Sequence, residues 1–145
     1  VGFPTETDDE FEETLEVLEA VRFDSIYAFK YSERPGTKAA KMADDVPLKT
    51  KKTRLARVLE LQGRITAERM AAYAGQRVEV LFEGPSRAMG KGLTDEWQMM
   101  GRTRTNVIVN VPIPKGDFWA NRWTGQVAQV DIVEVKAHSL YGRLA

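Results

Sequence analysis

The chain has 145 residues, of which 43% are hydrophobic and 29% charged, and its formal net charge is zero. These values are typical of a globular protein with one medium domain or two small ones, and no run approaches the roughly 20 apolar residues that span a bilayer. The chain contains no cysteine, which excludes disulfides, thiolate catalysis and cysteine-bound iron–sulfur clusters within these residues.

The first predicted element is a helix over residues 8–21. Thr7 and, three residues later, Glu10 form a capping-box pattern at its start, and apolar residues then recur at helical spacing. The carboxylates of the first turn complement the positive end of the helix dipole. This structural role argues against catalysis by these groups. The same acidic opening is unlike a signal peptide, so we predict a cytoplasmic location.

A strand is predicted over residues 23–31, where aromatic and β-favouring residues alternate between two faces. Tyr27, Phe29 and Tyr31 share one face, and smaller apolar residues share the other, so we expect both faces to be covered. A helix followed by such a strand is the repeating unit of a parallel α/β fold, whose sites lie at the carboxyl ends of the strands.

A long helical pattern begins at Pro47 and runs to about Tyr73, with Gly75 as its stop. Four cations crowd its start, where each costs about 0.3–1 kcal/mol beside the positive end of the dipole. These cations are Lys49, Lys51, Lys52 and Arg54. We expect them to pair with carboxylates of the preceding segment, and contact with phosphate is the alternative.

Beyond Gly75 the apolar period changes to about two, as in β-strands. The predicted strands lie near residues 78–82, 107–111 and 127–135, and glycine and proline separate them. Several short strands within about 70 residues indicate a small antiparallel barrel of the OB type.

The zero net charge conceals a division along the chain. Residues 1–47 carry 12 acidic and 5 basic side chains, residues 48–74 carry 2 and 7, and residues 75–145 carry 7 and 9. Because the first segment repels a polyanion, we predict that any nucleic-acid surface lies C-terminal to about Pro47. The other interpretation is that each segment presents an ordinary solvated surface.

Several motifs occur in an order that resembles one protein family. EGPS (83–86), GRTRTNVIV (101–109) and AHSLYG (137–142) resemble, in this order, a TRAM domain, which is a small RNA-binding β-barrel. The stretches VGFPTET (1–7) and FKYSERPGT (29–37) resemble the end of a radical-SAM barrel. Together the two parts are similar to the C-terminal part of the tRNA methylthiotransferase family.

The resemblance implies three segments. Residues 1–47 form an α/β fragment, the last strand–helix units of a partial TIM-type radical-SAM barrel; residues 48–74 form a basic connecting helix; residues 75–145 form an antiparallel OB-like TRAM barrel. In such an enzyme, S-adenosylmethionine and two [4Fe-4S] clusters serve to methylthiolate an isopentenylated adenosine beside the anticodon of tRNA. We expect the cluster-binding portion upstream of Val1, so that this fragment is not catalytic alone and binds the tRNA anticodon stem-loop.

The resemblance also implies residues on the cofactor side. Gly2, Phe29 and Tyr31 correspond to strand ends that shape the S-adenosylmethionine pocket, and packing within the barrel is the alternative for the two aromatic residues. Thr5 stands where the family usually has glycine, a departure that bears on any close backbone approach at this turn.

The RNA-binding assignment rests on side-chain chemistry as well. Arginine presents a planar fork to phosphate, threonine and asparagine donate hydrogen bonds, and Gly101 is expected to allow close backbone approach. The predicted RNA-binding residues are Lys91, Arg102, Thr103, Arg104, Asn106 and Lys136. Candidates for stacking on unpaired bases, with core packing as the alternative, are Trp97, Phe118, Trp119 and Trp123.

Alternatives to this function remain within and outside the family. RPGT (34–37) favours a tRNA substrate over the ribosomal-protein branch, which usually has EEGT, but the threonylcarbamoyl-adenosine branch shares RPGT. The alternative of another class is a stand-alone, non-catalytic RNA-binding module. We expect the full-length protein to be monomeric and the fragment to self-associate through exposed apolar strand edges in residues 1–47.

Overall fold

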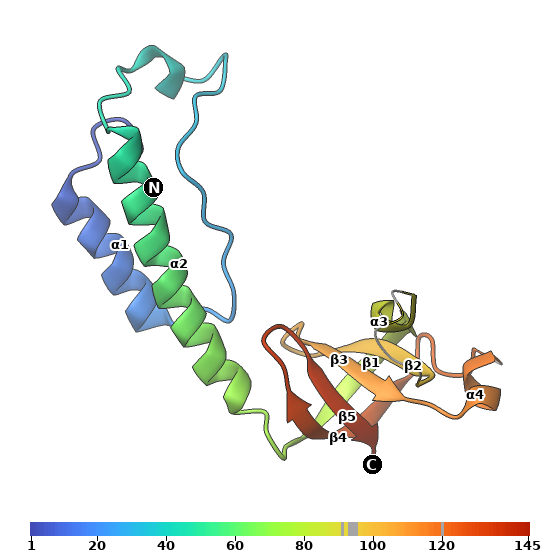
Figure 1. The fold of residues 1–145 in the computed structure, drawn as a ribbon. Helices are drawn as coiled ribbons and strands as arrows, with labels where there is room; N and C mark the ends of the chain where they lie inside the picture. Colours follow the sequence, from blue (N-terminus) through green and yellow to red (C-terminus); the bar gives the residue numbers. More distant parts are fainter. Residues whose placement is uncertain (91, 93–95, 120) are drawn as a thin grey trace. The chain divides into compact units, whose positions relative to one another are not determined.

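The computed structural model describes residues 1–90, 92, 96–119 and 121–145. The chain forms two compact units, Val1–Arg69 and Met70–Ala145, which are described separately (Figure 1). Among the described residues, no helix is both long and apolar enough to cross a membrane.

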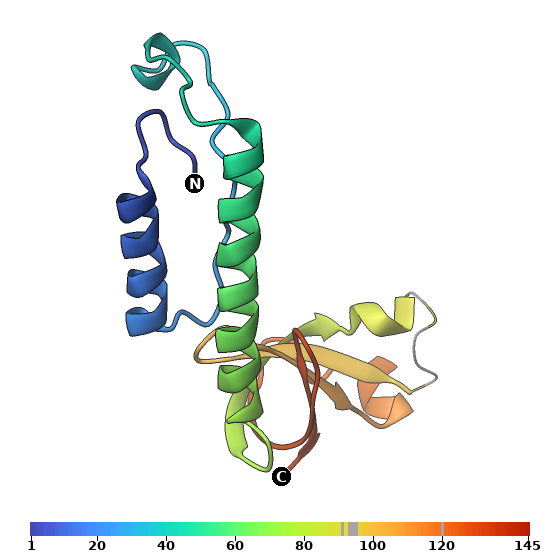
Figure 2. The same ribbon diagram turned by 60° about the vertical axis from the view of Figure 1, so that its left-hand side comes forward.

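The first unit is built on two helices that lie side by side, α1 (Asp8–Val21) and α2 (Leu48–Ala71) (Figure 2). Both predicted helices are thereby confirmed. The capping box at the start of α1 is present, since the Thr7 side chain accepts from the Glu10 amide and the Glu10 carboxylate accepts from the Thr7 amide. Phe11 and Leu18 of α1 are buried together with Val58 of α2.

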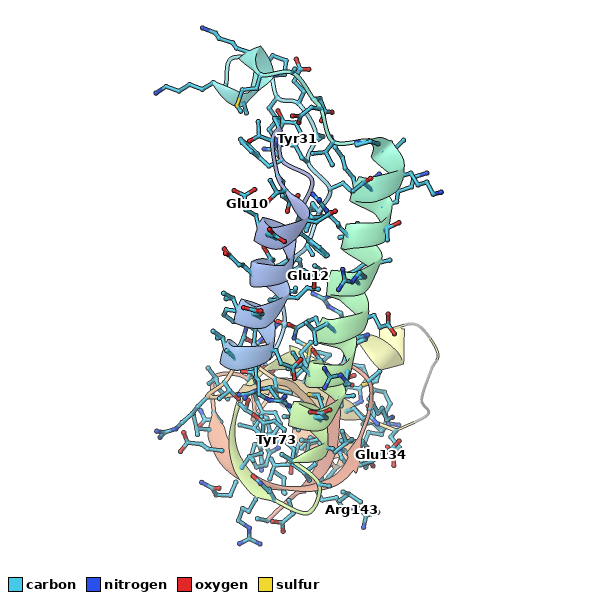
Figure 3. All side chains as sticks on the ribbon, turned by 90° about the vertical axis from the view of Figure 1, so that its left-hand side faces the viewer. Glu10, Glu12, Tyr31, Tyr73, Glu134 and Arg143 are labelled. Atoms are coloured by element: carbon cyan, nitrogen blue, oxygen red, sulfur yellow. The ribbon has the colours of Figure 1, made fainter. Side chains whose placement is uncertain are left out.

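Ion pairs follow the seam between the two helices. Arg57 bonds Glu12 at 2.5 Å and Arg64 bonds Glu19 at 2.7 Å, so both helices run in the same direction. Figure 3 shows Glu12 on the side of α1 that faces α2. The Arg57 guanidinium lowers the pKa of the Glu12 carboxyl by hydrogen bonding.

The predicted pairing of the cations at the start of α2 is confirmed for two of them. Lys51 bonds Asp44, and Arg54 bonds Glu6 at 3.0 Å and Asp8 at 2.6 Å. Both basic side chains are buried, so their charges require these carboxylates.

The prediction of a strand covered on both faces over residues 23–31 is wrong. Two hydrogen bonds, from the Val1 amino group to the Phe29 carbonyl and from the Tyr31 amide to the Val1 carbonyl, both 2.8 Å long, have the slanted pattern of a parallel ladder. These two bonds do not continue into a longer ladder, and residues 23–31 form no strand. Tyr27 is 92% exposed and Phe29 72%, so the expected apolar exposure in this segment is present.

The turn that precedes α1 contains a strained residue. Thr5 has a φ of 73°, a left-handed conformation that is an outlier for a β-branched residue. We expect Thr5→Gly to raise the free energy of unfolding of the first unit by about 1 kcal/mol, because glycine adopts this φ without a Cβ clash. The helical signal in circular dichroism during denaturation would measure the change. A loss of stability would show that the contacts of the Thr5 side chain contribute more to stability than the relief of its backbone strain.

The second unit is a closed barrel of five strands. They are β1 (Arg77–Pro85), β2 (Gln98–Thr103), β3 (Ile108–Pro112), β4 (Val127–Val135) and β5 (Leu140–Leu144). The order around the barrel is β1-β2-β3-β5-β4, and all neighbours are antiparallel except β3 and β5. The predicted OB-like barrel is therefore confirmed. The sequence patterns identified β1, β3 and β4 but did not predict β2 and β5.

The connections between strands carry short helices, α3 (Arg87–Gly90) and α4 (Lys115–Trp119), and a short 3₁₀ helix, η1 (Ala39–Lys41), lies in the first unit. Alternate residues of the strands point inward and form one apolar core, with Val80, Phe82 and Val109 among its most buried members. Successive side chains of a strand point to opposite faces, so the apolar residues that recur every second position in the sequence are the ones that face the core.

Candidate nucleic-acid interface

The β2–β3 hairpin holds most of the predicted RNA-binding residues at its closed end. Asn106 has a φ of 68°, which asparagine tolerates in tight turns. The Thr103 hydroxyl accepts from the Val107 amide at 3.1 Å and lies 3.0 Å from the Thr105 hydroxyl. The Tyr73 hydroxyl lies 2.6 Å from the same Thr105 oxygen. These bonds hold the turn in one conformation.

Arg102 is held from both sides at this turn. Its Nε donates to Glu83 at 3.0 Å, and its Nη1 donates to the Asn106 side-chain oxygen at 2.9 Å. Arg104 donates from Nε to Glu79 at 2.8 Å, and this carboxylate raises the pKa of the Arg104 guanidinium. The side chain of Arg104 is nevertheless 82% exposed.

These residues line a groove of about 410 Å³ on the outside of the barrel. Its lining consists of Glu79, Leu81, Glu83, Arg102, Thr103, Arg104, Asn106 and Val127. The structure therefore brings four of the predicted residues together. The sequence analysis missed the two glutamates, although their spacing on β1 with period two places them on one face.

The remaining predicted residues lie elsewhere or serve another role. Thr103 is buried, and its hydroxyl is engaged in the turn. Lys136 lies in the β4–β5 turn, at the same end of the barrel because β3 and β5 are parallel, with its Nζ 3.8 Å from Glu134. Lys91 lies outside the described residues.

The role predicted for Gly101 needs correction. A Cβ at this position would lie 2.5 Å from the Leu81 carbonyl oxygen and 2.5 Å from Val80 Cγ1. The close approach that requires glycine is therefore between β1 and β2 inside the barrel, not between the chain and an RNA backbone.

Phosphate can compete for the groove arginines. Arg102 and Glu83 are both about one-third exposed, and the pair of Arg104 and Glu79 is also open to solvent. Exposed ion pairs contribute only about 0–1 kcal/mol, so breaking these pairs would cost little if a phosphate took the place of the carboxylates. The carboxylates hold the guanidinium groups of Arg102 and Arg104 in one orientation. Side chains that are already oriented lose less conformational entropy when they bind a ligand.

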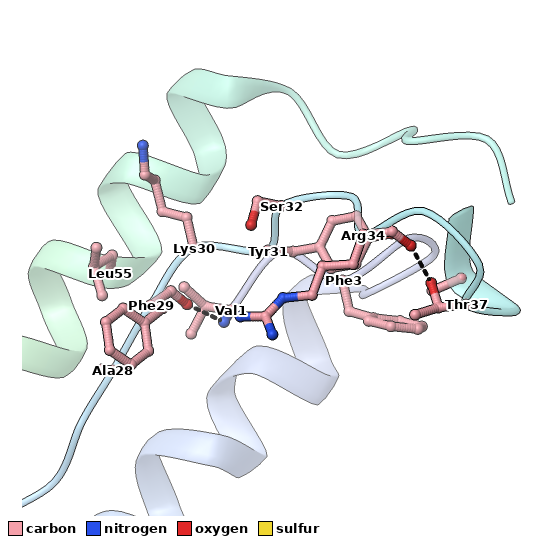
Figure 4. A pocket seen from close by; sticks show the side chains of 11 residues that line it. Val1, Phe3, Ala28, Phe29, Lys30, Tyr31, Ser32, Arg34, Thr37 and Leu55 are labelled. Carbon is pink, nitrogen blue, oxygen red and sulfur yellow. Dashed lines mark hydrogen bonds between the residues drawn. The ribbon is translucent and has the colours of Figure 1, made fainter. Parts of the chain in front are cut away.

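A second pocket, of about 720 Å³, lies in the first unit. Val1, Phe3, Phe29, Tyr31 and Arg34 are among its lining residues, and Figure 4 shows their side chains around it. The Phe3 and Tyr31 rings meet edge to face, with centroids 5.2 Å apart. The structure therefore brings Phe29 and Tyr31 to one pocket.

Gly2, the third predicted cofactor-side residue, is not among the residues that line this pocket. It is buried with a φ of 73°, and a Cβ there would collide with Lys51 Cγ. Its amide donates to Glu6, which in turn bonds Arg54. Among the described residues, no group of three or more histidine, aspartate or glutamate side chains is placed to hold a metal ion.

The closed five-stranded barrel with arginines on one hairpin belongs to the class of small OB-like barrels, which commonly bind nucleic acid. The family model of the TRAM domain matches residues 71–145, and the chain accordingly belongs to the TRAM domain family.

Curated relatives extend the similarity to the whole chain. The chain is 46% identical over 145 residues to a protein of Geobacillus thermodenitrificans, covering 100% of this chain and 25% of the relative. It is 45% identical over 144 residues to a protein of Bacillus licheniformis, covering 99% and 26%. Both relatives are named tRNA-2-methylthio-N(6)-dimethylallyladenosine synthase. The chain thus spans about a quarter of the length of the relatives that it matches.

Proposed function

We propose that this chain is the substrate-binding C-terminal part of a radical-SAM tRNA-2-methylthio-N(6)-dimethylallyladenosine synthase, with a cytoplasmic location. The observation that carries the proposal is the arginine groove on a TRAM barrel, in a chain that is similar throughout its length to enzymes of that name. The proposed partner is the tRNA anticodon stem-loop. The reaction belongs to the longer protein, and this part contributes binding and orientation.

The groove residues have distinct roles in this proposal. Arg102 and Arg104 contact phosphate, and Asn106 both holds Arg102 and donates a hydrogen bond of its own. Thr103 maintains the turn through its buried hydroxyl. Lys136, at the same end of the barrel, adds a further cation, and Lys91 is proposed as a contact on its chemistry alone.

The first unit supplies part of the cofactor side. Phe29 and Tyr31 offer aromatic walls, and a pocket of about 720 Å³ is large enough for a nucleoside-sized ligand. These features fit S-adenosylmethionine, which supplies a methyl group and a radical when bound. Gly2 acts indirectly, by allowing the turn to pack on Lys51. Because the chain has no cysteine, it provides no thiolate ligands for the two [4Fe-4S] clusters, which the longer protein must bind elsewhere.

A stand-alone RNA-binding module is the weaker alternative. The exposed Tyr27 and Phe29 have the character of an apolar surface that packs against further structure. The relatives that the chain matches over its whole length are also about four times as long.

The proposal predicts a defined effect of Arg102→Ala on RNA binding. Affinity for an RNA stem-loop is expected to fall about tenfold, the value of a charge-assisted hydrogen bond. The slope of log affinity against log salt is expected to become shallower by about one, as for one lost phosphate contact. Fluorescence anisotropy between about 50 and 200 mM salt measures both quantities.

Arg77→Ala provides the matched control. Arg77 is also an exposed barrel arginine bonded to a carboxylate, Asp131 at 2.7 Å, but it is not among the groove residues. Its loss should leave affinity and slope nearly unchanged. Equal effects of the two substitutions, or an unchanged slope for Arg102→Ala, would contradict the proposal that the groove binds RNA.

A further inference from the structure

A cluster of three aromatic rings lies at the other end of the β2–β3 hairpin. Trp97 precedes β2, and Phe118 and Trp119 end α4; the Trp97 ring centroid lies 5.0 Å from that of Phe118 and 5.1 Å from that of Trp119. Phe118 and Trp119 meet edge to face at 5.7 Å. In Figure 1, α4 lies beyond the end of β3 that is remote from the β2–β3 turn.

The cluster is anchored on one side and open on the other. Phe118 packs against the barrel core, and the Ile113 amide donates to the Trp97 carbonyl at 2.7 Å. Trp119 is 66% exposed, and it is the only aromatic residue among the large exposed hydrophobics of the described part of the barrel unit. An indole held by two neighbouring rings loses little conformational entropy when a flat ligand stacks on it.

The four aromatic candidates from the sequence are thus separated by burial. Trp123 packs on Phe82 with centroids 5.3 Å apart and belongs to the surroundings of the core. Trp119 does not share this packing. Core filling therefore accounts for Trp123 but leaves the exposure of Trp119 without a structural reason.

The aromatic cluster carries an exposed cation, and the nearby carboxylates among the described residues are engaged by other groups. Glu96, which precedes Trp97, accepts from the Gln98 amide group at 2.8 Å and from the Tyr141 hydroxyl at 3.1 Å. Lys115 is exposed, with its Nζ 5.6 Å from the centroid of the Trp97 ring. Asp117, the carboxylate within α4, is engaged by Arg122 at 3.3 Å. Lys115 lies over one ring of a cluster whose outer indole, that of Trp119, is exposed. A cation and an exposed aromatic face on one cluster are the two groups with which proteins bind the phosphate and the base of an unpaired nucleotide.

We propose that Trp119, supported by Trp97 and Phe118, stacks on an unpaired base of the RNA whose phosphates contact the arginine groove. This inference rests on the proposed function and deepens it. The register pairs Arg102 with Ile108 at one end of the hairpin and Gln98 with Pro112 at the other. Four residues separate Gln98 from Arg102, about 13 Å along the strand, a distance that a short single-stranded segment spans. The hairpin thus offers a charge contact at one end and a stacking contact at the other.

The test compares two RNAs and four variants of this chain, Trp119→Ala, Trp119→Phe, Val133→Ala and Arg102→Ala. The RNAs are a stem-loop with an unpaired loop and a fully paired duplex of the same length, and affinity is measured by anisotropy. Trp119→Ala is expected to weaken binding of the stem-loop about tenfold, to change duplex binding little, and to leave the salt slope unchanged, because stacking releases no counterions. Trp119→Phe keeps a ring and is expected to retain most of the affinity.

Val133→Ala is the control, since Val133 is an exposed apolar residue on β4 that is not among the groove residues. Val133→Ala should leave the affinity for both RNAs and the salt slope unchanged. If Arg102→Ala weakens binding but Trp119→Ala does not, or if both RNAs lose affinity equally with Trp119→Ala, the stacking proposal is overturned while the proposed function stands. If the unaltered chain binds neither RNA, both fail. Because Trp119 is exposed, its variants should keep the thermal midpoint of the barrel.

Discussion

Phe82→Ala is expected to lower the free energy of unfolding of the barrel by about 3–5 kcal/mol. Phe82 lies on β1, is 1% exposed, and meets the Trp123 ring edge to face at 5.3 Å. Removing the ring forfeits its buried apolar area and leaves a cavity that a closed barrel cannot easily collapse. All three tryptophans of the chain lie within residues 75–145, so tryptophan fluorescence during denaturation reports on this unit alone.

Phe82→Leu serves as the matched variant. Leucine retains most of the apolar volume, so we expect a loss of roughly 1 kcal/mol. The side chains flanking Phe82 on β1, Leu81 and Glu83, line the groove, and a weakened core should therefore also lower RNA affinity in Phe82→Ala. A change in stability below about 1 kcal/mol for the alanine variant would contradict the central position of Phe82 in the core.

Arg54→Met is expected to destabilise the first unit by about 3 kcal/mol. Methionine preserves much of the volume of the buried side chain but removes both bonds to Glu6 and the bond to Asp8. The Glu6 side chain is only 13% exposed, so its charge then remains in a poorly solvated position without its cation. Since α1 and most of α2 belong to this unit, the helical signal in circular dichroism measures the loss.

The double variant Arg54→Met with Glu6→Gln measures the interaction free energy between these two side chains. It should cost less than the sum of the single changes, because the glutamine leaves no unpaired charge. Glu6 also accepts from the Gly2 amide, so the loss of Arg54 should loosen the turn at the proposed cofactor side. Strictly additive effects would show that Arg54 acts on stability through other contacts, such as its position over the Phe11 ring.

The two units differ in how well local sequence signals predicted them. The capping box of Thr7 and Glu10 acts within one helical turn, so α1 was predicted with its correct bounds. Strand β2 was not predicted, because its sequence QMMGRT lacks β-branched residues in alternation and contains Gly101. That glycine is required by the approach of β1, which no local pattern reveals.

The segment 23–31 illustrates the opposite case. Its aromatic and β-branched residues favour a strand, yet the chain pairs it only at Val1. A β-preference is realised only when neighbouring strands satisfy the backbone groups along its whole length.

The candidate sites show the same limits. Arg102, Arg104 and Asn106 were identified from side-chain chemistry in one turn, because residues close in sequence remain close in a hairpin. The glutamates that hold the arginines come from β1, and only the pairing of Leu81 with Arg102 places them there.

The sequence by itself determined the helices of the first unit, the barrel class of the second and the basic character of the hairpin, since capping, periodicity and charge are local properties. The tertiary structure alone decided that Trp123 packs on the core while Trp119 stays exposed, and that Lys51 and Arg54 are buried with their carboxylates. Burial and partner choice depend on which distant segments come together, and this is a property of the packed chain.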